Sequence, residues 1–374
     1  MINNLINCNF QFEHITKMFP IIMTLKNIHQ NPKYHGEGNV FIHTQNVCNE
    51  ILSFDEFNYL NIDEKCILYL SALFHDIGKL TCTKIENGEI VSPRHAVRGS
   101  KAFRELFYKE YSHIYEISFN FRESIARLIK YHSLPFHFFE KENIDQYLLK
   151  VSEGTNMKLL YLLAKSDLLG RECSDKYDLL NNIEYFKEYC IDLGCYDDKK
   201  VFKNSYTRYK YLNNINTNTI HYEDELFDVT EFEVIVMCGL PLSGKDSFIK
   251  ENLINVPVIS LDDIREEFKI SPKQNSSKVA AIAKERAKNY LRQKKTFVWD
   301  ATNIMEDTRK RLCDLFSSYN ARVLFIYIES PYKELLKRNK KRERSIDIKV
   351  LDNMIHKFDM IEPYEGYVTE YVVH

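Results

Sequence analysis

Residues 239–247 read GLPLSGKDS, and they match the phosphate-binding loop pattern G-x-x-x-x-G-K-[ST] at every fixed position except the last. The apolar run FEVIVMCGL at 232–240 leads into this loop and predicts a strand. A strand, a glycine-rich loop and then a helix form the context in which backbone N–H groups and a helix N-terminus surround phosphate groups. The alternative, an ordinary turn, is disfavoured by the strand in front of it.

The residues of this loop have distinct expected roles. Lys245 should reach the outer phosphates as a point charge and act in catalysis. Asp246 stands where the pattern has a hydroxyl, and a carboxylate in the first helical turn could hold Mg²⁺ directly or through water. Ser247 could take part of the missing hydroxyl's role. The predicted nucleotide-binding residues of the loop are Gly239, Ser243, Gly244, Lys245, Asp246 and Ser247.

Beyond the loop, helical patterns alternate with three further apolar runs, at 256–261, 296–300 and 322–328. Strands that alternate with helices predict an α/β domain with a parallel sheet. Asp262 and Arg265 follow the second strand, where the first could act as general base on a hydroxyl and the second could clamp an acceptor phosphate. Asp300 ends another strand, at the sheet edge where ligands bind.

The run ELLKRNKKRER at 334–344 is basic and helical in pattern. Arg338 and Arg342 could close over a triphosphate and neutralise charge during phosphoryl transfer. A basic run is also typical of a solvated helix face, so this assignment depends on the motifs around it.

The ordered set GLPLSGKDS, DDIR, DATN and KRNKKR resembles the phage-type 5′-OH polynucleotide kinases over roughly residues 232–374. The resemblance implies that Asp262 is the general base and that Arg265 holds the acceptor phosphate. It also implies that Asp300 supports that arginine and that Arg342 is a lid arginine on the donor. The sequence departs from the family at Leu242, where such loops often carry glycine, and at Asp246.

The composition excludes several classes of protein. The chain has 374 residues, which suits two domains, and its 44% apolar content excludes a disordered protein. A net charge of −2 excludes a uniformly basic nucleic-acid-binding protein. The nine scattered cysteines contain no CxxC pair, which argues against a disulfide framework or a structural zinc site. With no apolar run of membrane-spanning length and no leader pattern, we expect a soluble cytoplasmic protein.

The front half reads as helical almost throughout, and the polar stretch 204–225 reads as a connector. We therefore predict an all-helical domain at 1–203, a connector at 204–231 and the α/β domain at 232–374. In the helical half, polar side chains repeatedly stand where the apolar period asks for a hydrophobic one. They are His43, His75, Asp76, His95, His132 and Asp167.

One such residue would most often be a hydrogen-bonded core histidine, but five helical faces with the same feature are better explained by convergence on a metal ion. Buried carboxylates without a partner are costly, and neutral imidazoles with carboxylates are common ligands of divalent cations. The remaining histidines show no such placement and are interpreted as ordinary surface or core residues: His14, His29, His35, His113 and His137.

The order H…HD…H…H…D resembles the HD phosphohydrolase superfamily, and HDIGK followed by RHAVRGS is most similar to the HD module of bacterial CCA-adding enzymes, over roughly 35–175. The resemblance implies an all-α bundle in which the core metal ligands are His43, His75, Asp76 and Asp167. His95 and His132 would serve a second metal or the substrate phosphate. Lys79 and Arg98 would bind phosphate oxygens, with Lys79 counted among the catalytic residues.

The two halves together resemble the bacterial HD–polynucleotide kinase end-healing proteins. That resemblance implies hydrolysis of 2′,3′-cyclic, 2′- or 3′-phosphate ends and transfer of the γ-phosphate of ATP or another NTP, with Mg²⁺, to a 5′-OH end of RNA or DNA. It also implies one or two divalent transition metal ions (Mn²⁺, Co²⁺, Ni²⁺ or Zn²⁺) in the helical half and a separate ligase as partner. Nucleic-acid contact should be salt-sensitive and use the basic runs 292–295 and 333–344.

Two other hypotheses remain. The first is an HD nucleotidase fused to a kinase for mononucleotides or another small hydroxyl compound. The second is a non-enzymatic RNA- or metal-binding regulator, gated by nucleotide, with degenerate sites. Phosphate transfer to a 5′-OH oligonucleotide but not to nucleosides would exclude the first.

Overall fold

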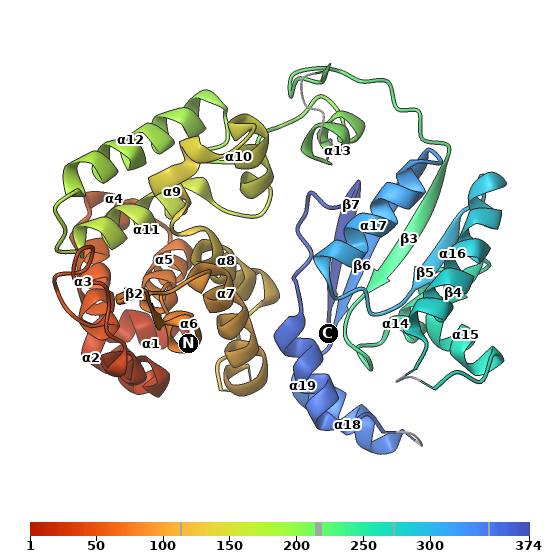
Figure 1. Ribbon diagram of the computed structural model, residues 1–374, viewed down its shortest axis with the longest axis horizontal. Helices are drawn as coiled ribbons and strands as arrows, with labels where there is room; N and C mark the ends of the chain where they lie inside the picture. The colour runs from red at the N-terminus through yellow and green to blue at the C-terminus, as the bar shows by residue number, and fades with distance from the viewer. Residues whose placement is uncertain (113, 214–218, 272–273, 343–344) are drawn as a thin grey trace. The chain divides into compact units, whose positions relative to one another are not determined.

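The computed structural model describes residues 1–112, 114–213, 219–271, 274–342 and 345–374. The chain divides into two compact units, unit 1 at Met1–Lys200 and unit 2 at Val201–His374. Figure 1 shows that unit 1 is helical and that unit 2 is built on a sheet. The predicted fold class, a helical domain followed by an α/β domain with a parallel sheet, is confirmed.

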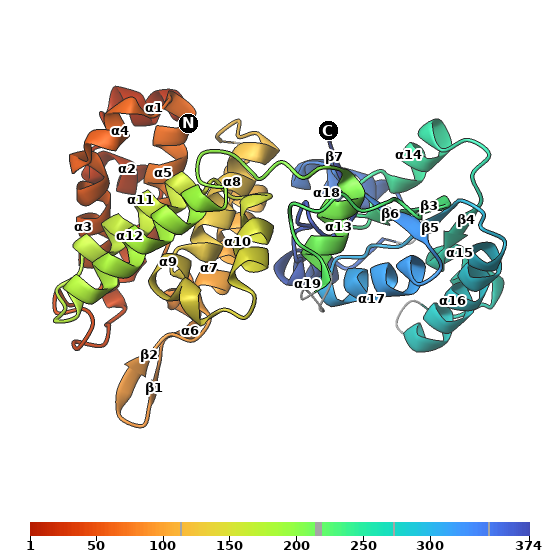
Figure 2. The ribbon, with the colours of Figure 1, turned by 90° about the horizontal axis from the view of Figure 1, so that it is seen from above.

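Unit 1 is a helical bundle with one small hairpin, β1 (Lys84–Glu86) paired antiparallel with β2 (Glu89–Val91). Figure 2 shows this hairpin projecting from the helices next to α6. The helices are α1 (Ile2–Asn7), α2 (Phe12–Met18), η1 (Pro20–Asn27), α3 (Val40–Ser53), α4 (Asp55–Tyr59), α5 (Ile62–Phe74), α6 (Lys79–Cys82), α7 (His95–Leu106), η2 (Phe107–Tyr111), α8 (Phe119–Tyr131), α9 (Leu134–His137), η3 (Phe138–Glu140), α10 (Ile144–Ser152), α11 (Met157–Leu169) and α12 (Lys176–Asp192).

The centre of unit 1 consists of α5 and α11, which are apolar on nearly every side. Side-chain caps fix where several of these helices begin, and Asn61 and Glu64 form a reciprocal capping box at the start of α5. Helices α3, α8 and α12 pack around this pair. Polar residues that these central helices carry inward are therefore forced into one shared interior.

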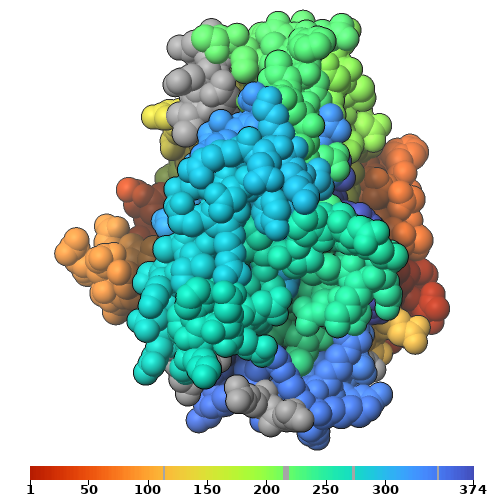
Figure 3. Space-filling view, turned by 90° about the vertical axis from the view of Figure 1, so that its right-hand side faces the viewer, coloured from red at the N-terminus to blue at the C-terminus, as the bar shows by residue number. Residues whose placement is uncertain are grey.

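Unit 2 contains a five-stranded sheet in the order β4-β5-β3-β6-β7, with every neighbouring pair parallel. Figure 3 shows one face of this unit, with α18 and α19 in blue along its lower edge. The strands are β3 (Phe232–Cys238), β4 (Val258–Ser260), β5 (Phe297–Asp300), β6 (Ala321–Glu329) and β7 (Val368–Val373), and the helices are α13 (Ser205–Asn213), α14 (Lys245–Asn252), α15 (Leu261–Glu267), α16 (Ser276–Arg292), α17 (Glu306–Ser317), α18 (Tyr332–Lys341) and α19 (Ile348–Lys357).

Helices cover both faces of this sheet, which explains why its strands read as continuous apolar runs. On one face Val298 packs in a cluster with Ile249 of α14. On the other face Trp299 and Phe297 make edge contacts with Phe316 of α17. The sheet therefore holds the carboxyl ends of β3, β4 and β5 at one edge, next to the loop that starts at residue 239.

Part of the predicted connector forms the helix α13, and residues 214–218 lie outside the described residues. Tyr209 of α13 stacks on Tyr367 with ring centroids 4.2 Å apart, and Arg208 donates to the carbonyl oxygens of Gly366 and Tyr367. Aromatic rings supply here the packing that aliphatic residues supply elsewhere. A search for aliphatic periodicity therefore does not find this helix.

Of the helices that the structure describes, none combines the length and the apolar character that a bilayer crossing requires.

Candidate functional site

Six polar residues of unit 1 meet in the interior of the bundle. His43 lies on α3, His75 and Asp76 directly follow α5, His95 begins α7, His132 directly follows α8 and Asp167 lies on α11. Except for His95, whose side chain is one-quarter exposed, these side chains are buried. The structure thus brings together the six metal ligands that the sequence predicts.

The imidazole rings in this cluster are held by the backbone. The Nδ1 atoms of His75, His95 and His132 lie 2.7, 3.0 and 2.8 Å from the carbonyl oxygens of the residues three positions earlier. Since a carbonyl oxygen only accepts, each Nδ1 must carry the proton, and each neutral ring presents a lone pair at Nε2. All three Nε2 atoms face the interior of the cluster.

These lone pairs face one another at short range. His43 Nε2 lies 3.3 Å from His75 Nε2, and His95 Nε2 lies 3.2 Å from His132 Nε2. His43 Nε2 also lies 3.0 Å from Asp167 Oδ1. Ligand atoms about 2.0–2.1 Å from one ion are themselves about 2.9–3.4 Å apart at octahedral to tetrahedral angles. The spacing therefore fits two ion-binding groups among the predicted ligands, one with His43, His75 and Asp167, the other with Asp76, His95 and His132, and a third group, His35, Glu37 and His43, adjoins the first.

Asp76 lies between the two groups. Within the described part of the chain neither of its buried carboxylate oxygens accepts a hydrogen bond. Oδ2 is 3.3 Å from His75 Nε2, and Oδ1 is 3.6 Å from His95 Nε2. Lys79 forms an ion pair with Oδ2 at 2.7 Å and donates to Gln30 Oε1 at 2.6 Å. A buried carboxylate with unused acceptor sites suits a divalent cation.

The protonation states agree with a ligand role. Burial lowers the pKa of His132 to about 3 and also lowers the pKa of His95, so both rings are neutral near pH 7. Burial alone would lower the pKa of His43 too, but Asp167 and Glu37 raise it above its usual value. A bound cation would replace that proton because imidazole ligates in its neutral form.

Sequence reasoning missed three residues of this cluster. Arg171 donates to both carboxylate oxygens of Asp167, at 3.0 and 2.5 Å. Glu37 lies 2.9 Å from His43 Nδ1, and His35, interpreted as an ordinary residue, contacts the same Glu37 oxygen at 2.8 Å. These residues lie outside regular helices, where apolar periodicity gives no signal. Of the other four histidines set aside, His113 lies outside the described residues, and His14, His29 and His137 do not belong to the cluster.

Arg98, predicted to bind phosphate, is exposed on α7 one turn after His95 and donates to the carbonyl oxygen of Thr81 at 3.2 Å. Its guanidinium has further donors that face solvent beside the cluster. The structure thus leaves it near the ligands, as expected, without placing it among them.

Gly78 lies where two segments of unit 1 approach each other closely. Its backbone is right-handed, with φ −65° and ψ −22°. A Cβ here would collide with the carbonyl oxygen of His95 and lie 2.5 Å from the amide nitrogen of Gly99. Glycine therefore permits the close approach that brings His95 to the cluster.

We predict that Gly78→Ala lowers the stability of unit 1 by about 2–3 kcal/mol, because the added methyl group has no space. It should also weaken divalent-ion binding, since His95 must move. Thermal unfolding with and without Mn²⁺ measures both. Gly88→Ala at the hairpin tip, where nothing lies within 4 Å and only its φ of +82° is strained, is the control. Equal losses in the two variants would contradict the steric explanation.

The second site surrounds residues 239–247 in unit 2. Gly239 has φ +142°, and a Cβ there would collide with the carbonyl oxygen of Ile328. Gly244 caps α14 with φ +107°. Leu242, where related loops carry glycine, also has a positive φ of +69°. The loop therefore keeps a conformation that favours glycine at a position where this sequence lacks it.

Lys245 is buried in this loop and donates to the carbonyl oxygens of Gly239 and Leu240, at 3.2 and 3.0 Å. Its charge acts on the carboxylates of Asp300, Asp246 and Asp262, and burial lowers its pKa. Asp246, Ser247 and Asp262 are exposed, and the buried Ser243 accepts a hydrogen bond at its carbonyl oxygen from Ser330 at 2.7 Å. The predicted loop residues and acids thus share one edge of the sheet.

Three arginines of unit 2 were predicted to bind phosphate groups. Arg265 donates to the carbonyl oxygens of Ser271 and Gln274, so among the described contacts it pairs with a loop rather than with Asp300. Arg338 donates to the carbonyl oxygen of Leu242 at 2.9 Å and so supports the loop itself. Arg342 is exposed at the C-terminal end of α18.

Asp300 is the most perturbed acid of this site. Burial, together with the charges of Asp246 and Asp262, raises its pKa to about 6, although Lys245 acts in the opposite direction. Its Oδ1 atom has no hydrogen-bond partner in the described structure. A carboxylate that is costly to ionise in this way is suited to bind Mg²⁺ or a proton.

We predict that Asp300→Asn stabilises metal-free unit 2 at pH 8 by about 1–3 kcal/mol and by less at pH 5. The folded pKa of Asp300 exceeds its ordinary 3.8, so the folded state binds more protons between pH 4 and 6 and loses stability as pH rises. Trp299, the single tryptophan, lies beside Asp300 and reports unfolding of this unit by fluorescence. A variant no more stable than the wild type at pH 8 would contradict this account.

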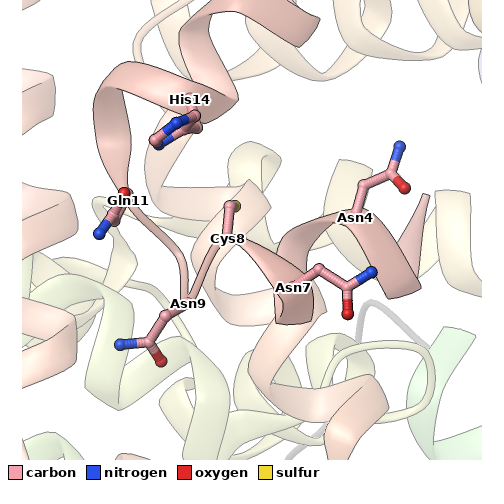
Figure 4. Close-up of a pocket in the computed structure, with 6 residues that line it drawn as sticks. All are labelled: Asn4, Asn7, Cys8, Asn9, Gln11 and His14. Atoms are coloured by element: carbon pink, nitrogen blue, oxygen red, sulfur yellow. The ribbon is translucent and has the colours of Figure 1, made fainter.

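A separate open hollow occurs at α1 and α2, lined by Asn4, Asn7, Cys8, Asn9, Gln11 and His14 (Figure 4). None of these residues belongs to the two sites described above, and amides dominate its lining. It does not offer the charged groups that phosphate chemistry requires.

Family models match part of each unit. A family model described as an HD domain matches residues 40–153, and one described as an AAA domain matches residues 234–361. An L-seryl-tRNA(Sec) kinase of Methanococcus maripaludis is 29% identical over 134 residues, which are 34% of this chain and 52% of that kinase. The chain thus spans about half the length of that relative.

Two solved structures are similar to part of the chain. A putative kinase from Chloroflexus aurantiacus has 13% identity and a TM-score of 0.32, with 39% of this chain and 86% of that chain covered. Kti12 of Chaetomium thermophilum, in complex with ADP-AlF3, has 16% identity and a TM-score of 0.30, with 38% and 88% covered.

Proposed function

Because the chain joins an HD hydrolase domain to a P-loop kinase domain, we propose that it is a bifunctional enzyme that heals the ends of broken RNA. The HD domain removes 2′,3′-cyclic, 2′- or 3′-phosphates, and the kinase domain phosphorylates a 5′-OH end. The observation that carries the proposal is the convergence of four imidazoles and two carboxylates in unit 1. That cluster suits phosphoester hydrolysis, while the loop in unit 2 suits phosphoryl transfer to a hydroxyl.

In unit 1 a divalent transition metal, when bound, supplies electrophilic assistance and lowers the pKa of a water molecule. His43, His75 and Asp167 would hold one ion, and Asp76, His95 and His132 a second. Lys79, fixed between Asp76 and Gln30, places a cation beside the phosphate. Arg98, at the surface of α7, can bind the next phosphate of a polynucleotide.

In unit 2 the loop amides and Lys245 bind the β- and γ-phosphates of ATP or another NTP. Asp246 and Asp300 would hold Mg²⁺, and Asp262 at the start of α15 accepts the proton of the attacking hydroxyl. Arg265 shapes the acceptor side by holding the segment that contains Ser271 and Gln274. A separate ligase would then join the two healed ends.

The direct test is an RNA oligonucleotide with a 5′-OH and a 2′,3′-cyclic phosphate, incubated with ATP, Mg²⁺ and Mn²⁺, Co²⁺, Ni²⁺ or Zn²⁺. Mass spectrometry of both ends should show a 5′-phosphate and a 3′ end without phosphate. Without ATP, the phosphate at the 3′ end should still be removed, and the 5′-OH end should stay unphosphorylated. Phosphorylation of nucleosides but not of the oligonucleotide would instead support an HD nucleotidase fused to a small-molecule kinase.

A second acceptor belongs in the same assay because of the relative that phosphorylates seryl-tRNA, as its name states. Seryl-tRNA also presents a hydroxyl on an RNA. Transfer to seryl-tRNA that greatly exceeds transfer to the 5′-OH oligonucleotide would overturn the end-healing proposal and leave the kinase fold intact.

A further inference from the structure

The loop before α3 carries a carboxylate that contacts a metal ligand from behind. Glu37 Oε1 lies 2.9 Å from Nδ1 of His43 and 2.8 Å from Nδ1 of His35. The Glu37 side chain is 1% exposed, and the two imidazole rings meet edge to face with centroids 4.8 Å apart. The opposite nitrogen of His43, Nε2, faces His75 and Asp167.

The second oxygen of the same carboxylate ties this loop to the end of α11. Glu37 Oε2 accepts from the backbone N–H of Glu172 at 3.0 Å, and Gly36 N–H donates to the carbonyl oxygen of Glu172 at 2.9 Å. Arg171, the residue before Glu172, holds Asp167 through two hydrogen bonds. Glu37 therefore connects the segments that carry His43 and Asp167, two ligands of one predicted ion.

We propose that Glu37 is a positioning residue that holds His43 with its Nδ1 protonated and its Nε2 directed at the divalent ion. A carboxylate that accepts from the far nitrogen of a ligating imidazole fixes the tautomer and the ring orientation and raises ligand basicity. Glu37 Oε1 lies within hydrogen-bonding distance of both nitrogens, Glu37 Oε2 is already used by the N–H of Glu172, and Nε2 of His43 remains directed at His75 and Asp167, so we assign Glu37 to the support of the ligand. This inference rests on the metal site of the proposed function.

The test measures metal binding, independently of catalysis, in the full-length protein. Mn²⁺ affinity is determined by competition titration for the wild type, Glu37→Gln and Glu37→Ala. We expect affinity to fall about tenfold in Glu37→Gln, which keeps one neutral acceptor, and about a hundredfold in Glu37→Ala. Glu184→Gln is the matched control, because Glu184 also pairs with neighbouring side chains, Tyr161 and Lys165, but away from the cluster.

A second measurement separates positioning from bracing of the fold. In the Zn²⁺-loaded protein with ¹⁵N-labelled histidine, the Nδ1–H proton of His43 should give the strongly downfield NMR signal of a hydrogen bond to a carboxylate in the wild type, and that downfield shift should be lost in Glu37→Ala. Kinase activity of Glu37→Gln should stay near wild type.

The outcomes separate a failure of the metal site from a failure of the role proposed for Glu37. If the wild type binds no divalent ion, the metal site and this inference both fail. If the wild type binds Mn²⁺ and Glu37→Ala binds it within threefold as tightly, or keeps the same downfield Nδ1–H signal of His43, only the role of Glu37 is overturned.

Discussion

Asp76→Asn should lower hydrolysis of a 2′,3′-cyclic phosphate end by at least about a thousandfold and leave the kinase reaction unchanged. Asp76 lies between both ion-binding groups, and its buried oxygens accept no hydrogen bond within the described residues. An amide removes the negative charge and leaves the Lys79 ammonium without its partner carboxylate. Loss of several kcal/mol of electrostatic assistance corresponds to a factor of this size.

The measurement is hydrolysis of an RNA that ends in a 2′,3′-cyclic phosphate, with metal content determined by elemental analysis. Asp63→Asn is the control, since Asp63 is an exposed acid in the first turn of α5, the helix that leads to Asp76. Hydrolysis within tenfold of wild type in Asp76→Asn would show that the cluster is a structural polar core and not a catalytic site.

The convergence of the six predicted ligands in unit 1 could be anticipated because each interrupts an apolar helical period. His43 and Asp167 stand on α3 and α11 at positions where a buried hydrocarbon is expected, and the structure buries both. In a helix, the spacing of residues in the sequence fixes the direction in which each side chain points. Because several helices carry a polar residue on the face that should be buried, these residues were expected to meet in the interior.

The supporting residues of the same site were not predictable in this way. His35 and Glu37 lie in a loop, and Arg171 lies just beyond α11, so none of them belongs to a periodic segment. The contact of Glu37 with the backbone of Glu172 also joins residues 135 positions apart. Nothing local in the sequence encodes that contact.

In unit 2 the order of strands and the loop were predictable, whereas some pairings were not. The strand run at 322–328 corresponds to β6, but β7 at the sheet edge was not predicted, although its sequence VTEYVV has the β-branched residues typical of a strand. Asp300 was expected to support Arg265, but Arg265 reaches the backbone of Ser271 and Gln274 instead. The order of the motifs indicates which residues lie at the same edge of the sheet. Which of them form hydrogen bonds with one another depends on side-chain length and on the position of the loops.

Lys245→Ala should lower kcat/KM for phosphoryl transfer by about a thousandfold or more, with hydrolysis at the other site within twofold of wild type. The Lys245 ammonium is buried and held by the carbonyl oxygens of Gly239 and Leu240, so it is already positioned where a γ-phosphate gains charge. Alanine also leaves the carboxylates of Asp300, Asp246 and Asp262 without their nearest cation. Transfer of ³²P from ATP to a 5′-OH oligonucleotide measures the loss.

Lys250→Ala provides the control, because Lys250 is an exposed lysine on the same helix, α14, and its removal changes the net charge equally. If both variants lost activity to the same degree, the loss would reflect charge on α14 and not the loop. A Lys245→Ala protein that still transferred phosphate at more than a tenth of the wild-type rate would remove this loop from the reaction. The departure at Asp246 would then mark a loop that keeps the shape of a phosphate site without its chemistry.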